Sequence, residues 1–288
     1  MTHTILKVEK CKVPAGIYIV ATPIGNLRDI TLRALDILHN ADIIACEDTR
    51  VSAKLLSAYG IRAKTIAYHD HNANSVRPKI FEAVKDGKVV VQISDAGTPL
   101  ISDPGYKLVA DAVAEGINVF PLPGACAPIT ALMGAGLPSD IFTFMGFLPT
   151  KEQAKRNVLE DLKESLGTVI FFDSPNRISD TIKVVSDIHP GADVVIGREL
   201  TKKFEQFIRG TAIEVLNLIE TMPKKGEIVV MLRVKDKEMS TDGVEELLEK
   251  ALLTMRLKDA STLVAEQTGL KKKDVYKLAL EIKDEAKN

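Results

Sequence analysis

Short apolar runs alternate with segments of helical periodicity between Gly16 and Pro121. The apolar runs lie at residues 17–20, 43–45, 89–91 and 117–120, with a weaker one at 64–68, and helical segments lie at 32–38, 51–59 and 106–114. Continuous apolar runs of this length are typical of strands that are buried on both faces of a sheet. The alternation therefore predicts an α/β domain with a mostly parallel sheet.

Strand-like runs continue in the second half of the chain, but their spacing changes. They lie at residues 142–145, 169–172, 194–196, 204–208 and 227–234, with helical segments between most of them. The last three lie close together, which indicates hairpins and an antiparallel contribution. We therefore expect a tail at residues 1–14, a first α/β domain at 15–122 and a second α/β domain of different topology at 123–236.

Three segments near the end of the chain have helical periodicity, at residues 244–254, 260–267 and 273–282. A polar linker at residues 235–240 precedes them, and Thr268-Gly269 supplies a helix stop. Three short helices with a tight turn predict a small helix-turn-helix-like segment at residues 241–288. Its acidic residues slightly outnumber its basic ones, so contact with nucleic acid and a role in docking or dimerisation both stay open.

The charge balance excludes one class of partner. The 38 Lys and Arg residues are offset by 39 Asp and Glu residues, which gives a net charge of -1. Indiscriminate binding to polyanions draws most of its affinity from an excess of Lys and Arg. An RNA partner would therefore need local basic patches.

Cysteine usage and hydropathy predict a cytoplasmic protein. Cys11, Cys46 and Cys126 are an odd number of cysteines without the spacing of metal ligands, as expected in a reducing compartment. Residues 1–12 lack the apolar core of a secretory signal. No apolar run approaches the ~20 residues of a membrane span, so we expect no membrane partner.

Polar and Gly/Pro-rich loops follow the predicted strands of the first domain. They comprise residues 22–26, 47–50, 69–72, 94–99 and 123–125. In an open parallel sheet, ligands bind outside the carboxyl ends of the strands, where such loops converge. The sequence therefore predicts a binding site at this edge of the first sheet.

The loop at residues 94–105 is the most distinctive of these. It packs two Pro, two Gly and two Asp into twelve residues, which makes a rigid backbone with exposed amides and carboxylates. Such a loop can cradle a polar ligand, although two tight turns capped by Asp and Ser would look the same. Its position after a buried strand favours the ligand site.

The next loop places two acids and a guanidinium, Glu47, Asp48 and Arg50, at a junction between a strand and a helix. Asp48 or Thr49 could be a helix N-cap, but capping explains only one residue of the motif. A hydroxyl nucleophile benefits from a placed base or a charge clamp. We therefore expect at least one of the three charged residues to be catalytic or to orient the substrate.

Two clusters in the second domain have both a structural and a functional interpretation. Lys151, Lys155 and Arg156 follow the apolar loop 147–149, where they could form a solvated helix face or a docking site for a phosphate backbone. The charged stretch 198–203 joins two predicted strands, and an ordinary turn is as good an interpretation as a functional one.

His69 and His71 could be read as a metal pair, but no third ligand follows at a recognisable spacing, so we expect a polar loop and no metal.

The chain lacks a Gly-x-Gly-x-x-Gly motif after the first strand, a Walker loop and a Gly-x-Ser-x-Gly elbow. Nicotinamide chemistry, phosphoryl transfer and serine hydrolysis are therefore disfavoured.

Four motifs occur in a fixed order along the chain, at residues 18–27, 47–50, 94–99 and 146–149. Together they resemble the ribosomal RNA small subunit methyltransferase I family, whose members belong to the tetrapyrrole methylase superfamily. Residues 198–202 and the terminal helices also match. The resemblance thus runs from about Gly16 to the end of the chain.

This resemblance implies two α/β domains of the tetrapyrrole methylase type with a cleft that holds S-adenosylmethionine. It also implies a homodimer that methylates the ribose 2′-oxygen of a cytidine in 16S ribosomal RNA, either free or in the 30S subunit. The implied cofactor contacts are Pro23, Asp95, Ala96, Gly97, Thr98, Ile101, Cys126, Ala127, Ser174 and Leu200. Cys126 departs from the family, in which Ser or Thr commonly stands at this position.

The implied chemistry is in-line attack of a ribose 2′-oxygen on the sulfonium methyl group, so alignment should supply most of the rate. Glu47 or Asp48 is the candidate base, and Arg50 and Lys151 are candidate contacts to phosphate or to the transition state. The candidate substrate contacts are Asn26, Lys151 and Arg156.

Two other functions stay open on the sequence. The same scaffold could methylate a tetrapyrrole precursor, although the terminal helices and the motif at residues 47–50 disfavour this. The chain could also be a ribosome-assembly factor that binds RNA without catalysis. Binding of S-adenosylmethionine alone would not separate the three.

Overall fold

The computed structural model describes residues 13–102, 105–164, 167–234, 241–268 and 270–285. The described residues up to Val234 form one compact unit, and those from Thr241 onward form another. Residues 1–12 with Cys11, residues 103–104 of the strand-end loop and the expected linker at 235–240 lie outside the described ranges.

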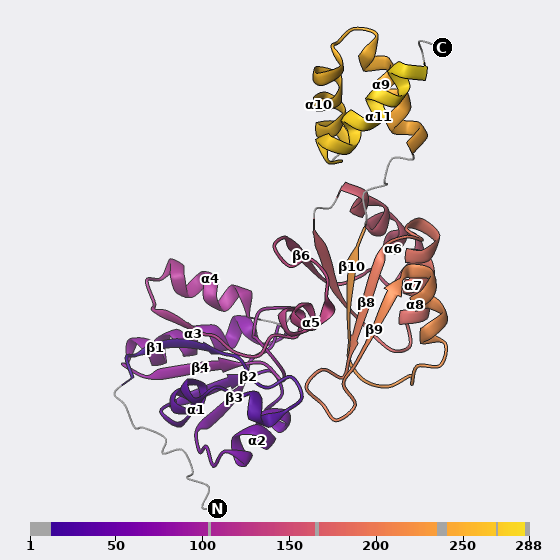
Figure 1. Ribbon diagram of the computed structural model, residues 1–288. Coiled ribbons are helices and arrows are strands. Elements are labelled where there is room, and N and C mark those ends of the chain that lie inside the picture. Colours follow the sequence, from indigo (N-terminus) through magenta and orange to yellow (C-terminus); the bar gives the residue numbers. More distant parts are fainter. Residues whose placement is uncertain (1–12, 103–104, 165–166, 235–240, 269, 286–288) are drawn as a thin grey trace, which may run out of the picture. The chain divides into compact units, whose positions relative to one another are not determined.

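The first sheet consists of five parallel strands in the order β3-β2-β4-β1-β5 (Figure 1). Its strands are β1 (Gly16–Val20), β2 (Ile43–Cys46), β3 (Lys64–Ala67), β4 (Val89–Ile93) and β5 (Val119–Leu122). The connecting helices are η1 (Leu27–Asp29), α1 (Leu32–His39), α2 (Thr49–Ala58), α3 (Ala73–Lys85) and α4 (Tyr106–Ala114).

Strand β1 shows why an unbroken apolar run forms a strand here. Ile17 and Ile19 belong to an apolar cluster with α3 and α4, whereas Tyr18 and Val20 belong to a second cluster with α1 and α2. Successive side chains of a strand point to opposite faces, so helices on both faces require apolar residues at every position. The predicted parallel α/β architecture is confirmed.

Two details of the first sheet differ from the prediction. Strand β5 continues through Pro121, which pairs with Ile19; proline is tolerated because β5 is an edge strand and one side of it needs no ladder partner. Helix α3 was not among the predicted helices and contains Pro78 in its interior, where proline removes a hydrogen bond and usually ends a helix.

The second sheet has the order β6-β7-β10-β8-β9 and mixes strand directions. Its strands are β6 (Phe142–Phe147), β7 (Thr168–Asp173), β8 (Asp193–Arg198), β9 (Gln206–Thr211) and β10 (Ile228–Arg233). Only β6 and β7 are parallel, while β10 runs antiparallel to β7 and β8, and β8 forms a hairpin with β9. The expected antiparallel contribution is therefore confirmed.

Helices again cover both faces of this sheet. Helix α5 (Ala127–Ala135) packs on one face, in a cluster that includes Val229 and Met231. The other face carries α6 (Glu152–Glu160), the short turn η2 (Asp161–Glu164), α7 (Ile178–Ile188) and α8 (Ala212–Ile219). Because α5 directly follows β5, the chain passes from the first sheet to the second through this helix.

The C-terminal unit consists of α9 (Thr241–Leu252), α10 (Leu257–Thr268) and α11 (Lys272–Glu285). Apolar residues of all three helices, among them Leu248, Val264 and Val275, form a cluster of their own. The predicted helical segment is confirmed. Within the described ranges of the whole chain, no helix is long and apolar enough to cross a membrane.

Candidate functional site

The loops after β1 and β4 are joined by a short antiparallel bridge. The amide of Thr22 donates to the carbonyl of Gly97 at 2.8 Å, and the amide of Gly97 donates back to Thr22 at 3.0 Å. The buried hydroxyl of Thr22 also donates to the carbonyl of Ser94 at 3.1 Å. These bonds satisfy backbone groups that would otherwise be orphaned at the ends of buried strands. The two loops therefore form one rigid element.

The loop after β4 (residues 94–102) has an unusual backbone. We call it the cofactor loop because the family resemblance predicts cofactor contacts within it. Gly97 has a φ of 81°, and the non-glycine residues Leu100 and Ser102 also have positive φ, of 75° and 62°. The Ser94 hydroxyl donates to the Gly97 carbonyl at 3.1 Å and stabilises the turn. Left-handed backbone at non-glycine residues costs free energy and is concentrated at functional sites. A turn is present at residues 99–100, but the positive φ of Leu100 and Ser102 goes beyond what an ordinary turn requires.

Asp95 does not cap its own turn, because its Oδ1 accepts a hydrogen bond from the amide of Asp48 at 3.1 Å. This bond ties the cofactor loop to the loop after β2. On the other side, the Thr98 hydroxyl donates to the carbonyl of Ala125 at 2.9 Å, in the loop after β5. The cofactor loop thus contacts the loops after β1, β2 and β5, as the strand-end argument predicted.

The loop after β5 approaches β1 closely. A Cβ atom on Gly124 would lie 2.6 Å from the Cβ of Ala21, so only glycine fits here. Cys126 is the N-cap residue of α5 and its side chain makes no capping hydrogen bond. Ala127 begins the helix and packs with Ala125 on the apolar cluster of the second sheet. The predicted contacts Cys126 and Ala127 therefore lie beside the Thr98 anchor.

The segment after β8 packs against the loop after β1. A Cβ atom on Gly25 would lie 2.9 Å from the carbonyl oxygen of Leu200, and Leu200 shares an apolar cluster with Ile24. Glu199 and Thr201 adopt positive φ, of 52° and 64°. A strained turn in contact with the first sheet supports the functional interpretation of residues 198–203.

An ion-pair network holds this strained turn. The Lys202 ammonium lies 2.9 Å from Glu199 Oε1 and 3.1 Å from Glu227 Oε2. The hydrogen bond from Lys202 lowers the pKa of Glu199. Partial burial alone would lower the pKa of Lys202, but the hydrogen bonds that its ammonium donates to Glu199 and Glu227 outweigh this effect and raise the pKa. Glu199 and Lys202 are therefore charged at neutral pH.

The acidic motif after β2 caps helix α2. Asp48 is the N-cap residue, and its Oδ1 accepts hydrogen bonds from the Arg50 amide at 2.8 Å and from Arg50 Nε at 3.0 Å. Arg50 Nη2 reaches Oδ2 at 2.7 Å. The hydrogen bonds from Arg50 lower the pKa of Asp48 to about 2. Asp48 is therefore a carboxylate with little affinity for a proton, which makes it a weak base.

Glu47 stands next to this pair on the edge of a surface depression of about 500 Å³. The depression is lined by Glu47, Asp48, Thr49, Arg50, Ala67, His69, His71 and Asp95. The loops after β2, β3 and β4 all contribute to it. The catalytic candidates thus lie beside Asp95, near the start of the cofactor loop.

The histidine loop has the polar structure expected for it. Asn72 accepts from the amide of His69 at 2.9 Å and donates to the carbonyl of Ala67 at 2.9 Å. The rings of His69 and His71 meet edge to face with centroids 5.9 Å apart. Among the described residues, no group of three or more His, Cys, Asp or Glu side chains could hold a metal ion.

The remaining predicted contacts are spread more widely. Asn26 is exposed and caps the turn η1 by accepting from the Arg28 amide at 3.1 Å. Pro23 lies between Thr22 and Ile24, and Ile101 is 40% exposed in the cofactor loop. Ser174 follows β7 in the second sheet, and its amide donates to Asp173 Oδ1 at 2.8 Å.

Sequence reasoning missed Asp173 and Arg177 near Ser174. Arg177 lies 3.7 Å from the buried Asp173 carboxylate and donates to the carbonyls of Leu148 and Pro149 at 2.9 and 3.3 Å. The pair therefore fixes the loop after β6. The available signal was a polar residue, Asp173, directly after the apolar run predicted as a strand at residues 169–172.

The expected basic cluster is partly wrong. Lys151 is exposed, as a docking residue should be, but Lys155 is only 4% exposed and donates to the hydroxyl of Thr181 at 3.1 Å. Lys155 lies one helical turn before the buried Leu159, so both side chains face the core. Arg156 is half-buried and lies 3.3 Å from Asp187. Lys151 is thus the exposed, accessible cation of the three.

Two family models match the chain in consecutive order. Residues 16–216 match the tetrapyrrole (corrin/porphyrin) methylases, and residues 238–283 match the RsmI C-terminal HTH domain. The first match alone covers more than half of the chain.

Curated relatives match over nearly the full length. Proteins called ribosomal RNA small subunit methyltransferase I are 46% identical in Mesorhizobium japonicum, 44% in Vibrio cholerae and 42% in Escherichia coli O157:H7. The alignments cover 92–93% of this chain and 92–96% of each relative.

Solved structures share the fold at lower identity. Diphthine synthase has a TM-score of 0.60 at 14% identity and covers 75% of this chain and 89% of its own. Cobalt precorrin-4 methyltransferase has a TM-score of 0.56 at 20% identity, with 75% and 93% covered. A uroporphyrin-III C-methyltransferase from Thermus thermophilus, solved with S-adenosyl homocysteine, has a TM-score of 0.51 at 17% identity, with 75% and 96% covered.

Proposed function

The chain belongs to the ribosomal RNA small subunit methyltransferase I family, and we propose that it transfers the methyl group of S-adenosylmethionine to the ribose 2′-oxygen of a cytidine in 16S ribosomal RNA. The acceptor atom is the one that the sequence resemblance implies. Among the described residues, no contact points specifically to methylation of a tetrapyrrole precursor.

One observation carries this proposal. The motifs that define the resemblance are scattered over residues 18–149, yet hydrogen bonds join three of them at one sheet edge, through Thr22 and Gly97 and through Asp48 and Asp95. A further bond from Thr98 to Ala125 adds the loop after β5. Their convergence at the carboxyl ends of parallel strands is the arrangement of a ligand site.

The residues at this edge fit S-adenosylmethionine. Ile24 and Leu200 supply an apolar wall for an adenosine ring, and the exposed backbone of Ala96 and the carboxylate of Asp95 supply polar partners. A Cβ atom on Gly97 would lie 3.1 Å from Ile24 Cγ2, so glycine leaves room that a side chain would fill. The bound cofactor supplies an electrophilic methyl group on a sulfonium.

Of the two candidate bases, the site favours Glu47. Asp48 is engaged by Arg50 on both carboxylate oxygens, and its pKa of about 2 disfavours proton uptake. The Asp48 side chain instead holds Arg50 at the mouth of the depression, where the Arg50 side chain is 88% exposed and can meet a phosphate. In this proposal Glu47 accepts the hydroxyl proton, Arg50 orients the RNA backbone, and positioning supplies most of the rate.

The RNA partner is ribosomal RNA of the small subunit, and we propose contacts at Arg50, Asn26, Lys151 and Arg156. A net charge of -1 gives no general attraction to RNA. We propose a homodimer, which would present two copies of each contact, and a cytoplasmic location where small subunits assemble. A strictly monomeric sedimentation profile would remove the dimer.

The test supplies labelled S-adenosylmethionine and the purified protein with small subunits from a strain that lacks this methyltransferase. Free 16S RNA and a porphyrinogen are offered in parallel reactions. We expect label in ribosomal RNA and none in the porphyrinogen. Label in the porphyrinogen alone would replace the proposal with tetrapyrrole methylation, and no label in any substrate would favour a binding factor without catalysis.

A further inference from the structure

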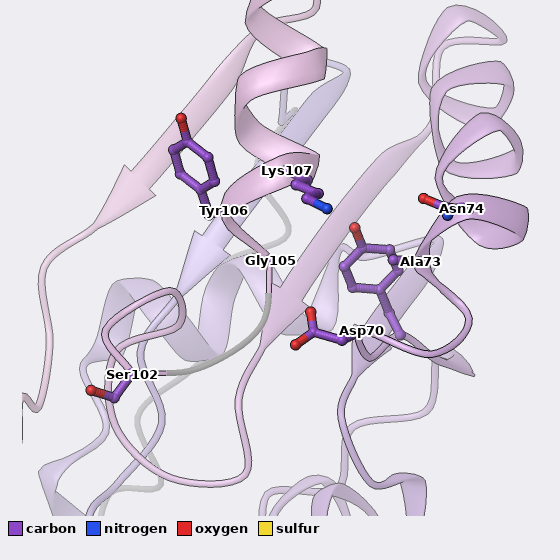
Figure 2. A pocket seen from close by; sticks show the side chains of 8 residues that line it. Asp70, Ala73, Asn74, Ser102, Gly105, Tyr106 and Lys107 are labelled. Carbon is purple, nitrogen blue, oxygen red and sulfur yellow. The ribbon is translucent and has the colours of Figure 1, made fainter. Parts of the chain in front are cut away.

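A second pocket lies beside the cofactor loop, on the face of the first sheet that α3 and α4 cover (Figure 2). Its volume is about 610 Å³, within the range of small-ligand sites. It is lined by Tyr68, Asp70, Ala73, Asn74, Ser102, Gly105, Tyr106 and Lys107. None of these residues belongs to the depression that contains Glu47. Ser102 is the end of the cofactor loop, so the pocket borders the proposed cofactor site.

Tyr68 brings an unsatisfied hydroxyl to this pocket. The residue is 2% exposed, and its hydroxyl has no hydrogen-bond partner among the described residues. Buried hydroxyls are nearly always hydrogen-bonded, so an orphaned one that lines a cavity indicates a missing ligand group. Burial raises the pKa of Tyr68. The phenol is therefore protonated and can donate a hydrogen bond at neutral pH.

Asn74 is held in a fixed orientation. Its Oδ1 accepts a hydrogen bond from Arg77 Nη2 at 2.8 Å, and the buried Arg77 is itself paired with Asp111. With its oxygen occupied in this way, the amide NH₂ of Asn74 is the group left to donate to a ligand. Figure 2 shows Asn74 from α3 and Lys107 from α4 pointing into the same space, with the Asp70 carboxylate below them.

The first turn of α4 adds an anion site at the edge of this pocket. Gly105 is the N-cap residue and offers no side chain to satisfy the first amides of the helix. Unpaired amides at a helix N-terminus bind phosphate, and the Lys107 ammonium adds a charge at the same place. Tyr106 is 74% exposed, which is unusual for a large aromatic residue, and such rings stack on unpaired RNA bases.

We propose that this pocket receives the base of the target cytidine, unstacked from the RNA, with a backbone phosphate at the first turn of α4. The inference rests on the proposed function. Cytosine presents an amine, a ring nitrogen and a carbonyl along its pairing edge. Asp70 can accept from the amine, and Tyr68 and Asn74 can donate to the two acceptors. Uracil carries a carbonyl opposite Asp70 and an N–H opposite a donor, so the pocket rejects it.

The test compares small subunits reconstituted from 16S transcripts with cytidine or uridine at the target position. The wild-type protein should prefer cytidine. Tyr68→Phe and Asp70→Asn should each raise KM for the cytidine subunits about tenfold, the effect of one lost hydrogen bond of about 1.4 kcal/mol, and should weaken the preference. Affinity for S-adenosylmethionine should not change. Asp86→Asn, at the far end of α3, is the matched control and should behave like the wild type.

The stability of Tyr68→Phe gives an independent reading. Removal of an orphaned buried hydroxyl should leave the melting temperature unchanged or raise it, so a higher KM cannot be attributed to misfolding. An active wild-type protein whose Tyr68→Phe and Asp70→Asn variants keep both KM and base preference would overturn the inference. Loss of preference at a neighbouring nucleotide instead of the target would also overturn it. A wild-type protein that methylates neither substrate would overturn the proposed function as well.

Discussion

Gly25→Ala tests whether the contact between the loop after β1 and the turn after β8 shapes the cofactor site. The new Cβ would lie 2.5 Å from Lys202 Cγ, 2.8 Å from Thr201 Oγ1 and 2.9 Å from the Leu200 carbonyl oxygen. Carbon atoms normally approach to about 3.5–4.0 Å. The Lys202 side chain could move, but the Leu200 carbonyl belongs to a strained backbone and cannot. The loops must therefore separate by several tenths of an ångström.

Overpacking of this kind costs about 1–3 kcal/mol. A loss of about 2 kcal/mol would lower the melting temperature by roughly 4–8 °C for a unit of this size. The strain is relieved when the wall of the site opens, so closing the wall around S-adenosylmethionine costs free energy. A cost of about 1.4 kcal/mol raises the Kd for S-adenosylmethionine about tenfold. Thermal unfolding and calorimetric titration measure the two effects separately.

Gly191→Ala is the matched control, because a Cβ atom there would meet nothing within 4 Å. The control should keep both the melting temperature and the cofactor affinity of the wild-type protein. If Gly25→Ala matched this control in both measurements, the reasoning that places Leu200 against the cofactor would be refuted.

Three further predictions concern the charged residues of the site. Glu47→Gln should lower turnover by about 100-fold or more while cofactor binding is kept, because it removes the proposed base but not the pocket. Unchanged turnover in single-turnover assays would mean that another group is the base. The pKa of Asp48 is lowered to about 2 from an ordinary value of 3.8 by hydrogen bonds from Arg50, so its carboxylate stabilises the fold above about pH 4 and this stabilisation is lost as the pH falls through 2. Asp48→Asn, which can still cap α2, should therefore be less stable than the wild type at pH 7 and equally stable near pH 2 in thermal unfolding, and a constant difference across this range would contradict the assignment. Lys151→Ala should weaken binding to small subunits and reduce its salt dependence, whereas Lys155→Met should leave binding within about twofold because Lys155 is buried; a filter-binding titration in which Lys155→Met is the weaker variant would show that the burial is misassigned.

The apolar runs were sufficient to predict both sheets, because a strand that is buried in a sheet consists largely of apolar residues. The convergence of these loops at one sheet edge followed from the rule for parallel strands. Helix α3 escaped prediction since Pro78 interrupts its interior, and a local pattern does not reveal that packing of Ile80 and Phe81 against the sheet compensates for the lost hydrogen bond.

The residues of the site were harder to predict individually. The sequence allows Asp48 to be a helix cap or a base. The three hydrogen bonds from Arg50, which the sequence does not reveal, favour the cap. The expectation that Lys155 is exposed is wrong because the aliphatic part of a lysine side chain can pack in a core while its ammonium donates to one buried group, here the Thr181 hydroxyl. Tyr68 gave no signal in the sequence, because the feature that distinguishes it is a buried hydroxyl without a hydrogen-bond partner among the described residues.

The central claim is that this chain methylates a ribose hydroxyl of small-subunit ribosomal RNA. Mass spectrometry of nuclease digests from a strain lacking the methyltransferase, complemented with the wild-type gene or with Glu47→Gln, tests it directly. We expect the wild-type gene to restore one ribose-methylated cytidine and Glu47→Gln to leave that nucleotide unmodified. A methyl group found on a base instead, or no change in ribosomal RNA with the wild-type gene, would contradict the claim.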